Sequence, residues 1–487
     1  MSFLDAPDYW SARFLLQRAL GVVYLMAFLV AAHQFRGLCG ERGILPVRRV
    51  LRRFDWKTLP SLFWLSPHDR TFTAAAWAGV ALSLFATSGL SDAFGFPVSL
   101  VTWFLLWILY LSFVSFGQLF YAYGWESLLL EVGFLAIFLG PSSAEPTWPT
   151  IWLVRWLLFR VKFGAGMIKM RGDRCWRELT CLDHHYETQP LPNPLSFFLH
   201  RSPSWFHKLE VLFTHGVQLV LIWGIFLPQP WAAMAGGAVL LFQGMLILSG
   251  NLSWLNYLTG ILALACFSDP LLPFLESLRP DVLAERPVGF DGLLLVVAGL
   301  ILILSYRPAK NLFSRKQRMN ATFDRFHLVN TYGAFGSVTK ERREIEIQGT
   351  RDEDPGEHAE WRTYRFKGKP GDPRRRPPWV APYHLRLDWQ MWFAAMSPVE
   401  YQPWFQLFAI RLMRGVPEVR SLLAEDPFGE EPPTWIRAIW YRYRFATLTE
   451  WWRSGRWWVR DRLGEYMPPV RAREERGEAR GEEDLRP

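Results

Sequence analysis

Residues 163–176 read FGAGMIKMRGDRCW, and within them an apolar segment of the chain ends and a polar loop begins. The loop runs on to His207 and collects cysteine, histidine, tryptophan and proline side chains. Most of the sequence before Arg307 predicts membrane anchoring. Because the chemically distinctive residues gather in this loop, we expect the function to be located here.

The overall composition favours a membrane protein with a soluble part. The chain has 487 residues, of which 50% are hydrophobic and 26 are tryptophan. Tryptophan suits membrane–water interfaces, because its ring is apolar and its N–H group is polar. The formal net charge is +9, which basic loops facing anionic lipid head groups explain. The sequence contains no nucleic-acid-binding motif, so membrane lipids are expected partners and nucleic acid is not.

Apolar segments long enough to approach a membrane span recur along the first two thirds of the chain. A helix needs about 20 apolar residues to cross a bilayer. About nine segments approach this: 14–35, 71–90, 97–117, 125–140, 151–170, 211–227, 231–249, 253–274 and 288–306. We therefore predict a polytopic α-helical transmembrane domain of about nine spanning helices over residues 1–310, with a polar central loop at 171–210.

After Arg307 the composition changes to that of a soluble domain. Residues 344–348 and 436–445 alternate in polarity, as half-buried strands do, and 361–367 is a third strand candidate. Residues 388–396 and 404–413 have a helical pattern. We predict a soluble C-terminal domain over residues 320–465 that is α+β or β-sandwich-like. Residues 466–487 are highly charged and poor in apolar residues, which predicts a disordered tail.

Basic residues at both ends of the membrane region bear on orientation. Residues 46–54 read PVRRVLRRF and place their apolar side chains on one helical face, as an interfacial amphipathic helix or a solvated surface helix would. Further basic residues follow the last apolar segment. The positive-inside rule then places the first loop and the soluble domain in the cytoplasm.

The fifth apolar segment carries charges that a bilayer disfavours. Arg155, Lys162 and Lys169 are seven residues apart, which places them within about 40° of one another on a helix. A charge at the bilayer centre costs about 2.5–3.5 kcal/mol on insertion scales. Lys162 is therefore expected to face the bundle interior and to meet Glu126 or Glu131 of the preceding segment.

Polar residues of the sixth segment extend this predicted buried network. Its members are Glu126, Glu131, Arg155, Lys162, His215 and Gln218. Two interpretations stay open. The network is either a structural set of ion pairs or a polar cavity that binds an anionic group or a proton-carrying substrate.

The two cysteines of the central loop, Cys175 and Cys181, form either a disulfide or two free thiols. A disulfide closing so short a loop stabilises the fold by about 2.4 kcal/mol in the chain-entropy model, and it requires an oxidising compartment. The adjacent His184 and His185 point in different directions and lack the usual ligand spacing, so we expect no metal and no cofactor. No catalytic Ser-centred elbow or kinase motif is present.

Four stretches closely resemble the lipase maturation factor family. They are the long run from residue 163 to residue 194, NTYGAF at 330–335, YRFKGKPG at 364–371 and LDWQMWFAA at 387–395. The resemblance implies a multi-pass resident of the endoplasmic reticulum membrane that assists the folding and assembly of secreted lipases into active form. It implies the inner membrane if the source is bacterial. It also implies a lumenal C-terminal domain, against the charge-based orientation.

A folding factor of this kind would contact a secreted lipase client and would not need to be an enzyme. The client-contact candidates are aromatic and histidine side chains of the central loop and of the C-terminal domain, where core packing is the alternative interpretation: Trp176, His184, His185, Tyr186, Trp389, Trp392 and Phe393.

A weaker resemblance concerns the membrane half alone. AGMIK at 165–169, followed by Asp173 and Trp176, is similar to part of the vitamin K-dependent gamma-carboxylase membrane domain. The alternative function that this implies is an integral-membrane enzyme acting on a lipid or quinone-like substrate, with Lys169 as the base. A lysine becomes a base near neutral pH only when it is desolvated or placed near other cations.

Overall fold

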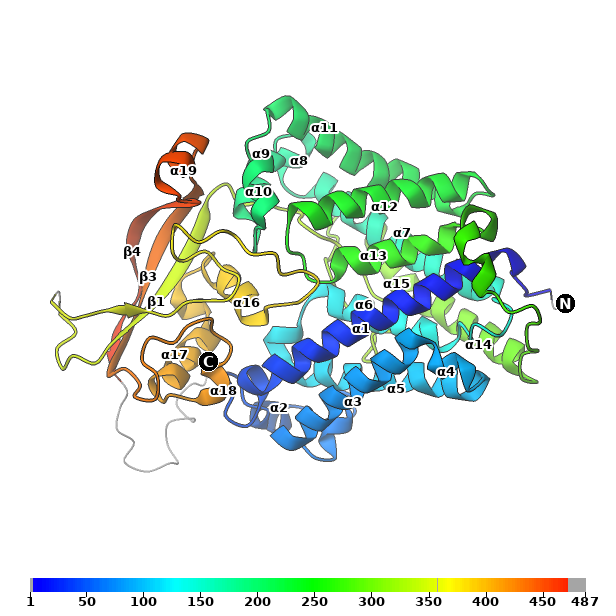
Figure 1. Cartoon of the computed structure of the whole chain (residues 1–487), viewed down its shortest axis with the longest axis horizontal. Coiled ribbons are helices and arrows are strands. Elements are labelled where there is room, and N and C mark those ends of the chain that lie inside the picture. Colours follow the sequence, from blue (N-terminus) through cyan, green and yellow to red (C-terminus); the bar gives the residue numbers. More distant parts are fainter. Residues whose placement is uncertain (1–2, 357, 472–487) are drawn as a thin grey trace.

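The computed structural model describes residues 3–356 and 358–471, which form a helical half and a smaller half built on a β-sheet (Figure 1). The helical half consists of α1 (Trp10–Cys39), α2 (Arg48–Arg53), α3 (Asp69–Ser88), α4 (Leu90–Ala93), α5 (Phe96–Phe116), α6 (Gly124–Ile137), α7 (Trp148–Arg171), α8 (Arg174–Arg177), α9 (Leu182–Thr188), α10 (Pro194–Leu199), α11 (Ser204–His215), α12 (Trp231–Ser249), α13 (Leu255–Ala263), α14 (Phe290–Leu304) and α15 (Tyr306–Phe313). The second half contains β1 (Arg342–Thr350), β2 (Arg362–Thr363), α16 (Arg386–Ala394), α17 (Pro403–Met413), α18 (Pro417–Arg420), β3 (Trp435–Phe445), α19 (Leu448–Ser454) and β4 (Trp458–Arg471).

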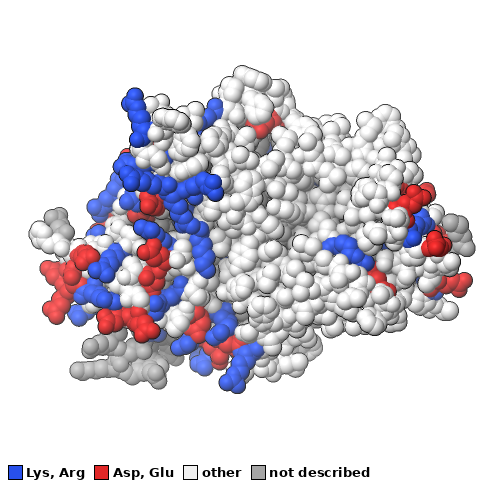
Figure 2. Space-filling model, viewed as in Figure 1, with Lys and Arg blue, Asp and Glu red and all other residues white. Residues whose placement is uncertain are grey.

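Six helical segments of the described chain are long and apolar enough to cross a membrane. They are 7–39, 69–88, 96–116, 204–226, 231–249 and 290–313. Figure 2 shows a broad area with few charged side chains over the helical half, and most of the charges in this view lie toward its two ends. The chain is therefore an integral, multi-pass membrane protein.

The predicted count of nine spans is not confirmed. Helix α6 has 14 residues, and α13 has nine before a short 3-10 turn. Nearly every residue of α6 is buried, including Glu126 and Glu131. Helix α7 has 24 residues, but basic side chains interrupt its apolar character. These three helices are enclosed by other parts of the protein, and burial inside a protein needs fewer apolar residues than contact with lipid does.

The described residues of the C-terminal half form one four-stranded antiparallel sheet with helices packed against it. The strand order is β2-β1-β3-β4. In the long β1–β3 pair, Ile345 lies opposite Trp440. The C-terminal half is therefore α+β, which is one of the two predicted architectures. The strands predicted at 344–348 and 436–445 are confirmed, whereas the one at 361–367 shrinks to the two residues of β2.

The predicted start of the disordered tail at residue 466 is wrong. Strand β4 continues to Arg471, because Tyr466 and Met467 are both 5% exposed and pack into the core. The Tyr466 hydroxyl also donates a hydrogen bond to the Ala394 carbonyl oxygen at 3.1 Å. The rest of the predicted tail, residues 472–487, lies outside the described residues.

The connection between the two halves lies along the end of α7, which explains the glycines of the FGAG run. A Cβ atom at Gly164 would lie 2.4 Å from the Tyr332 carbonyl oxygen, so a larger residue would force the two backbones apart. Beyond the helix, the Asp173 N–H donates to the Gly336 carbonyl oxygen at 2.8 Å. The quoted stretch therefore seats the C-terminal half on the membrane half.

Candidate functional site

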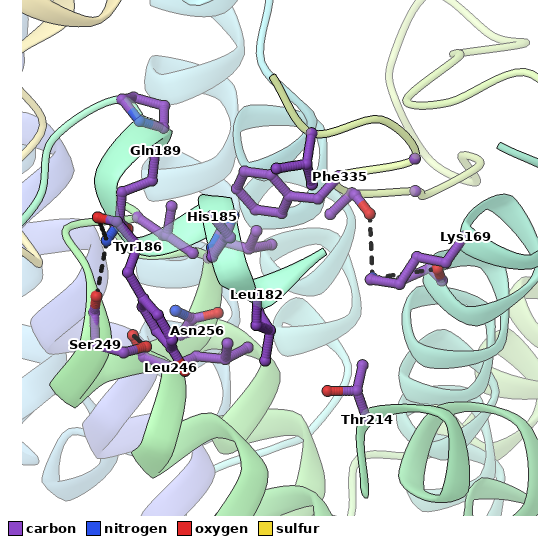
Figure 3. A pocket seen from close by; sticks show the side chains of 18 of the residues that line it. Lys169, Leu182, His185, Tyr186, Gln189, Thr214, Leu246, Ser249, Asn256 and Phe335 are labelled. Carbon is purple, nitrogen blue, oxygen red and sulfur yellow. Dashed lines mark hydrogen bonds between the residues drawn. The ribbon is translucent and has the colours of Figure 1, made fainter. Parts of the chain in front are cut away.

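A cavity of about 780 Å³ lies where α7, the central loop, α11 to α13 and the C-terminal half meet. Most of its lining is apolar, and its polar lining includes Lys162, Lys169, Glu210, Gln218, Gln243 and Asn256. Figure 3 shows Lys169 extending into the open centre, with Tyr186 and Leu246 on the opposite side. The enclosed volume falls within the range of about 300–1,000 Å³ that is usual for small-molecule pockets.

Lys162 is buried in the wall of this cavity, at 3% exposure. Its ammonium group donates to the Gln243 side-chain oxygen and lies 4.6 Å from the centre of the Phe242 ring. The Gln243 amide in turn donates to the Asn256 carbonyl oxygen at 3.2 Å. The prediction that Lys162 faces the bundle interior is confirmed, but its partner is an amide and not a glutamate.

Lys169 is held by neutral groups as well. Its Nζ donates to the Ala334 carbonyl oxygen at 3.1 Å, to Gln218 Oε1 at 3.2 Å and to the Ala165 carbonyl oxygen at 3.3 Å. The Trp176 ring centre lies 5.2 Å away, so a cation–π contact completes the set. Gln218 therefore belongs with Lys169 and lines the cavity.

The two glutamates of α6 have other partners than predicted. Glu126 accepts from Arg386 Nη1 at 2.8 Å and from the Tyr110 hydroxyl. Glu131 pairs with Arg160 and accepts from the Asn330 N–H at 3.0 Å. The prediction considered partners within the membrane half, whereas Arg386 and Asn330 reach α6 from the C-terminal part of the chain.

Arg155 and His215 lie outside the cavity lining. Arg155 Nε donates to the Ala265 carbonyl oxygen at 2.9 Å, and its Nη2 donates to the Tyr9 hydroxyl at 3.0 Å. A ring nitrogen of His215 lies 3.0 Å from the Trp176 carbonyl oxygen. Both side chains thus fix neighbouring segments, and the predicted network divides into structural contacts and two cavity residues, Lys162 and Gln218.

The central loop is a compact wall of the cavity. A disulfide joins Cys175 and Cys181, whose Cα atoms are 4.8 Å apart, and it packs in a small apolar cluster with Trp176 and Tyr186. The Trp176 indole N–H donates to the Phe335 carbonyl oxygen at 2.7 Å. These contacts hold the loop between α7 and the connection to the C-terminal half.

The client-contact candidates of this loop are mostly buried. Trp176, His185 and Tyr186 are 3%, 8% and 4% exposed and line the cavity, whereas His184 is half-buried and does not line it. Burial, with a smaller effect of the nearby Lys169 charge, lowers the pKa of His185 to about 4. His185 is therefore neutral near pH 7. The buried three face the contents of the cavity, so they do not form an exposed docking surface.

The candidates on α16 close the cavity from the other half. Trp389 is 3% exposed, and its ring centre lies 4.9 Å from that of Trp125, so it packs in the core. Trp392 donates to the Thr188 carbonyl oxygen at 2.9 Å. Phe393 is 40% exposed. All three line the cavity, and only Phe393 is accessible enough to meet a protein partner directly.

Both halves match family models. One, described as the lipase maturation factor transmembrane domain, matches residues 11–274, and another, the lipase maturation factor C-terminal domain, matches residues 328–468. This chain belongs to the lipase maturation factor family. The cavity is lined from both matched regions, so it lies within the architecture that the family models describe.

Relatives in the lipase maturation factor family match along nearly the whole chain. Lipase maturation factor 1 of Bos taurus is 43% identical, over 97% of this chain and 91% of that protein. The Homo sapiens protein of the same name is 42% identical, over 96% and 89%. Lipase maturation factor 2 of Xenopus laevis is 31% identical, over 93% and 81%. No solved structure matches, and nothing in these comparisons favours the carboxylase alternative.

Several lining residues of this family member escaped the sequence analysis. Gln243 is the single amide within the otherwise apolar residues 231–249, and that isolation was an available signal. Asn256 and Glu210 lie among other polar residues and carried no comparable signal. Phe335 carried no such signal, because it comes to the cavity through the connection between the halves. Within the described residues, no group of three or more histidine, cysteine, aspartate or glutamate side chains is placed to hold a metal ion.

Proposed function

We propose that this protein assists the folding and assembly of secreted lipases into active form. The observation that carries this proposal is the similarity to proteins named lipase maturation factor, which extends over both halves of the chain. The close seating of the C-terminal half on the membrane half supports a role that uses both together. A membrane-anchored domain is suited to retaining a client near the bilayer where it is made.

We place this function in the endoplasmic reticulum membrane, with the C-terminal half in the lumen, or in the inner membrane if the source is bacterial. The Cys175–Cys181 disulfide supports an oxidising compartment for the central loop. Arg342 joins this loop to the C-terminal half, since its Nη2 donates to the Pro190 carbonyl oxygen at 3.0 Å. The disulfide and the C-terminal half therefore lie on the same side of the membrane.

The arginines of α2 favour the opposite orientation under the positive-inside rule, because the first loop lies at this same end. Arg42 pairs with Glu418 of α18 at 2.8 Å and so ties the first loop to the C-terminal half. We give the disulfide more weight. Charge bias is a statistical tendency of loops, whereas a stable disulfide requires an oxidising environment.

The client-binding surface that we propose is formed by exposed aromatic side chains of the C-terminal half. Phe393 is 40% exposed, Tyr401 is 76% exposed and Trp452 is 83% exposed. Exposed aromatic side chains are common anchors of protein interfaces. Trp389 is excluded from this surface by its burial.

The test is loss and restoration of the gene in cells that secrete a lipase. We expect the enzymatic activity per unit mass of secreted lipase to fall on deletion and to return with the wild-type gene. A triple variant Phe393→Ala/Tyr401→Ala/Trp452→Ala should restore less activity than wild type while accumulating normally. Unchanged specific activity of every secreted lipase after deletion would contradict the proposal.

Orientation has an independent test in sealed microsomes that carry a C-terminally tagged protein. We expect protease to spare the tag until detergent is added. Digestion of the tag in intact vesicles would place the C-terminal half in the cytoplasm and would contradict the proposed lumenal contact with clients.

A further inference from the structure

The cavity reaches the protein surface through an apolar opening. Leu195 and Phe198 of α10 and Leu248 of α12 line it, and they are 38%, 45% and 52% exposed. Helix α12 is one of the segments apolar enough to span a membrane. A molecule entering here would therefore pass apolar side chains before it met a charged group.

The inner part of the cavity carries two cations without an anionic partner. Lys162 and Lys169 donate only to amide and carbonyl oxygens, and no carboxylate of residues 3–356 and 358–471 forms an ion pair with either. Buried charges are costly unless they are paired. Elsewhere in the same bundle, Glu126 and Glu131 each have an arginine. Arg155 likewise has only neutral partners, but it lies outside the cavity lining, so within the lining the two lysines are the basic groups that lack a carboxylate partner.

The other titratable groups of the lining do not neutralise this pair. Glu210 is 9% exposed, and its Oε1 accepts from the Tyr186 hydroxyl at 2.8 Å. It forms no ion pair with either lysine. The neighbouring His185 is neutral near pH 7 because burial lowers its pKa to about 4. The lining therefore holds two basic side chains and one acidic side chain, and neither basic side chain has a carboxylate partner.

We propose that this cavity binds a single-chain lipid with an anionic head group. The head group accepts hydrogen bonds from Lys162 and Lys169. The chain lies along the apolar lining, which includes Phe242, Leu246 and Leu255, toward the exposed side chains of Leu195, Phe198 and Leu248. The two lysines are about 10.5 Å, or about two turns, apart along the helix axis, so the head group lies between two side chains that reach it from different turns of α7. This proposal is independent of lipase maturation, since it concerns a ligand of the isolated protein.

The experiment measures lipid binding to the purified full-length chain in detergent by native mass spectrometry. Three probes share one chain: oleate carries a carboxylate, lysophosphatidate with an oleoyl chain carries a phosphate, and monoolein is neutral. We expect at least one anionic probe to bind about tenfold or more tightly than monoolein, because hydrogen bonds to charged groups contribute that much. The tighter of the two anionic probes identifies the head group as carboxylate or phosphate.

Variants connect the binding to the lysines. Lys162→Met/Lys169→Met keeps an unbranched side chain only one atom shorter and removes both ammonium groups, and it should reduce the preference for the anionic probe by about tenfold or more. Lys208→Met is the matched control, because Lys208 is exposed on α11. It should bind like wild type. Melting temperature and gel filtration verify that the variants fold.

Two results would overturn the proposal. One is equal binding of monoolein and of both anionic probes to the wild-type protein, which needs no variant and so holds even if the double variant does not fold. The other is an unchanged anionic preference in a folded Lys162→Met/Lys169→Met protein.

Discussion

Helices α6 and α7 bury their charges in opposite ways. Glu126 and Glu131 of α6 each meet an arginine, and these pairs connect α6 to the C-terminal part of the chain and to α7. Lys162 and Lys169 of α7 meet only neutral acceptors, at the edge of an apolar cavity. Equal burial therefore corresponds to two roles. The Glu126–Arg386 pair holds the two halves together, the Glu131–Arg160 pair joins α6 to α7, and the lysines keep hydrogen-bonding capacity for the proposed ligand.

The largest expected effect comes from breaking a paired charge on the α6 side. Arg386→Ala leaves Glu126 buried without its cation, which typically costs about 3–5 kcal/mol. We expect a correspondingly large loss of thermal stability in purified protein. Arg374→Ala is the control, because Arg374 is exposed and should change stability by no more than about 0.5 kcal/mol. Equal melting temperatures of the two variants would show that the Glu126–Arg386 pair does not hold the halves together.

A smaller loss of stability is expected from removing the disulfide of the central loop, which lines the cavity beside Lys169. Cys175→Ser/Cys181→Ser removes the disulfide and should lower the free energy of unfolding by about 2.4 kcal/mol in the chain-entropy model. Denaturant unfolding checks this, with Cys39→Ser/Cys266→Ser as a comparison that leaves the loop intact. Reducing agent should destabilise the wild type and the comparison protein and leave the Cys175→Ser/Cys181→Ser variant unaffected. A wild type insensitive to reduction would mean that the bridge contributes nothing.

The local patterns of the sequence were enough to predict the helices and strands. They were not enough to predict the partners of the buried charges. The apolar segments predicted α1, α3, α5 and α12 closely, and the alternating polarity of residues 436–445 predicted β3. Glu126 and Arg386 are 260 residues apart, and no periodicity connects them. The cavity was equally hidden, because its lining comes from many separate elements. Sequence predicted that Lys162 needed an interior environment, but only the fold shows that Lys169 is buried as well and which groups surround the two lysines.

Because His185 is buried in the cavity lining, it should make the stability of the protein depend on pH. Its pKa of about 4 in the folded protein lies below the ordinary value of about 6.5, so the unfolded chain binds the proton more readily. The contribution of neutral His185 to the free energy of unfolding is present above the unfolded pKa of about 6.5 and is lost as the pH falls toward 4. Between pH 7 and pH 6 the loss is about 0.7 kcal/mol by linkage. His185→Leu should flatten this part of the profile, measured by denaturant unfolding.

A second variant separates two effects of His185→Leu, which are the loss of a titrating group and the loss of packing contacts. Leu182 lies one turn away on α9 and is 8% exposed. Leu182→Ala should lower stability at every pH and keep the wild-type slope between pH 7 and pH 6. A wild-type slope in His185→Leu as well would assign the pH dependence to other groups.

A nearly neutral effect is expected when Lys162 and its partner Gln243 are replaced together. Lys162→Met alone leaves the Gln243 oxygen buried without its donor, at a cost of about 1–3 kcal/mol. Lys162→Met/Gln243→Leu removes both partners together, and such replacements are nearly neutral. We therefore expect the double variant to be within about 1 kcal/mol of wild type and more stable than the single variant. An ion pair that holds the fold would not behave in this way, as Arg386→Ala should show. If the double variant lost as much stability as Arg386→Ala, Lys162 would belong with the structural charges of α6, and its place in the cavity wall would need no ligand to explain it.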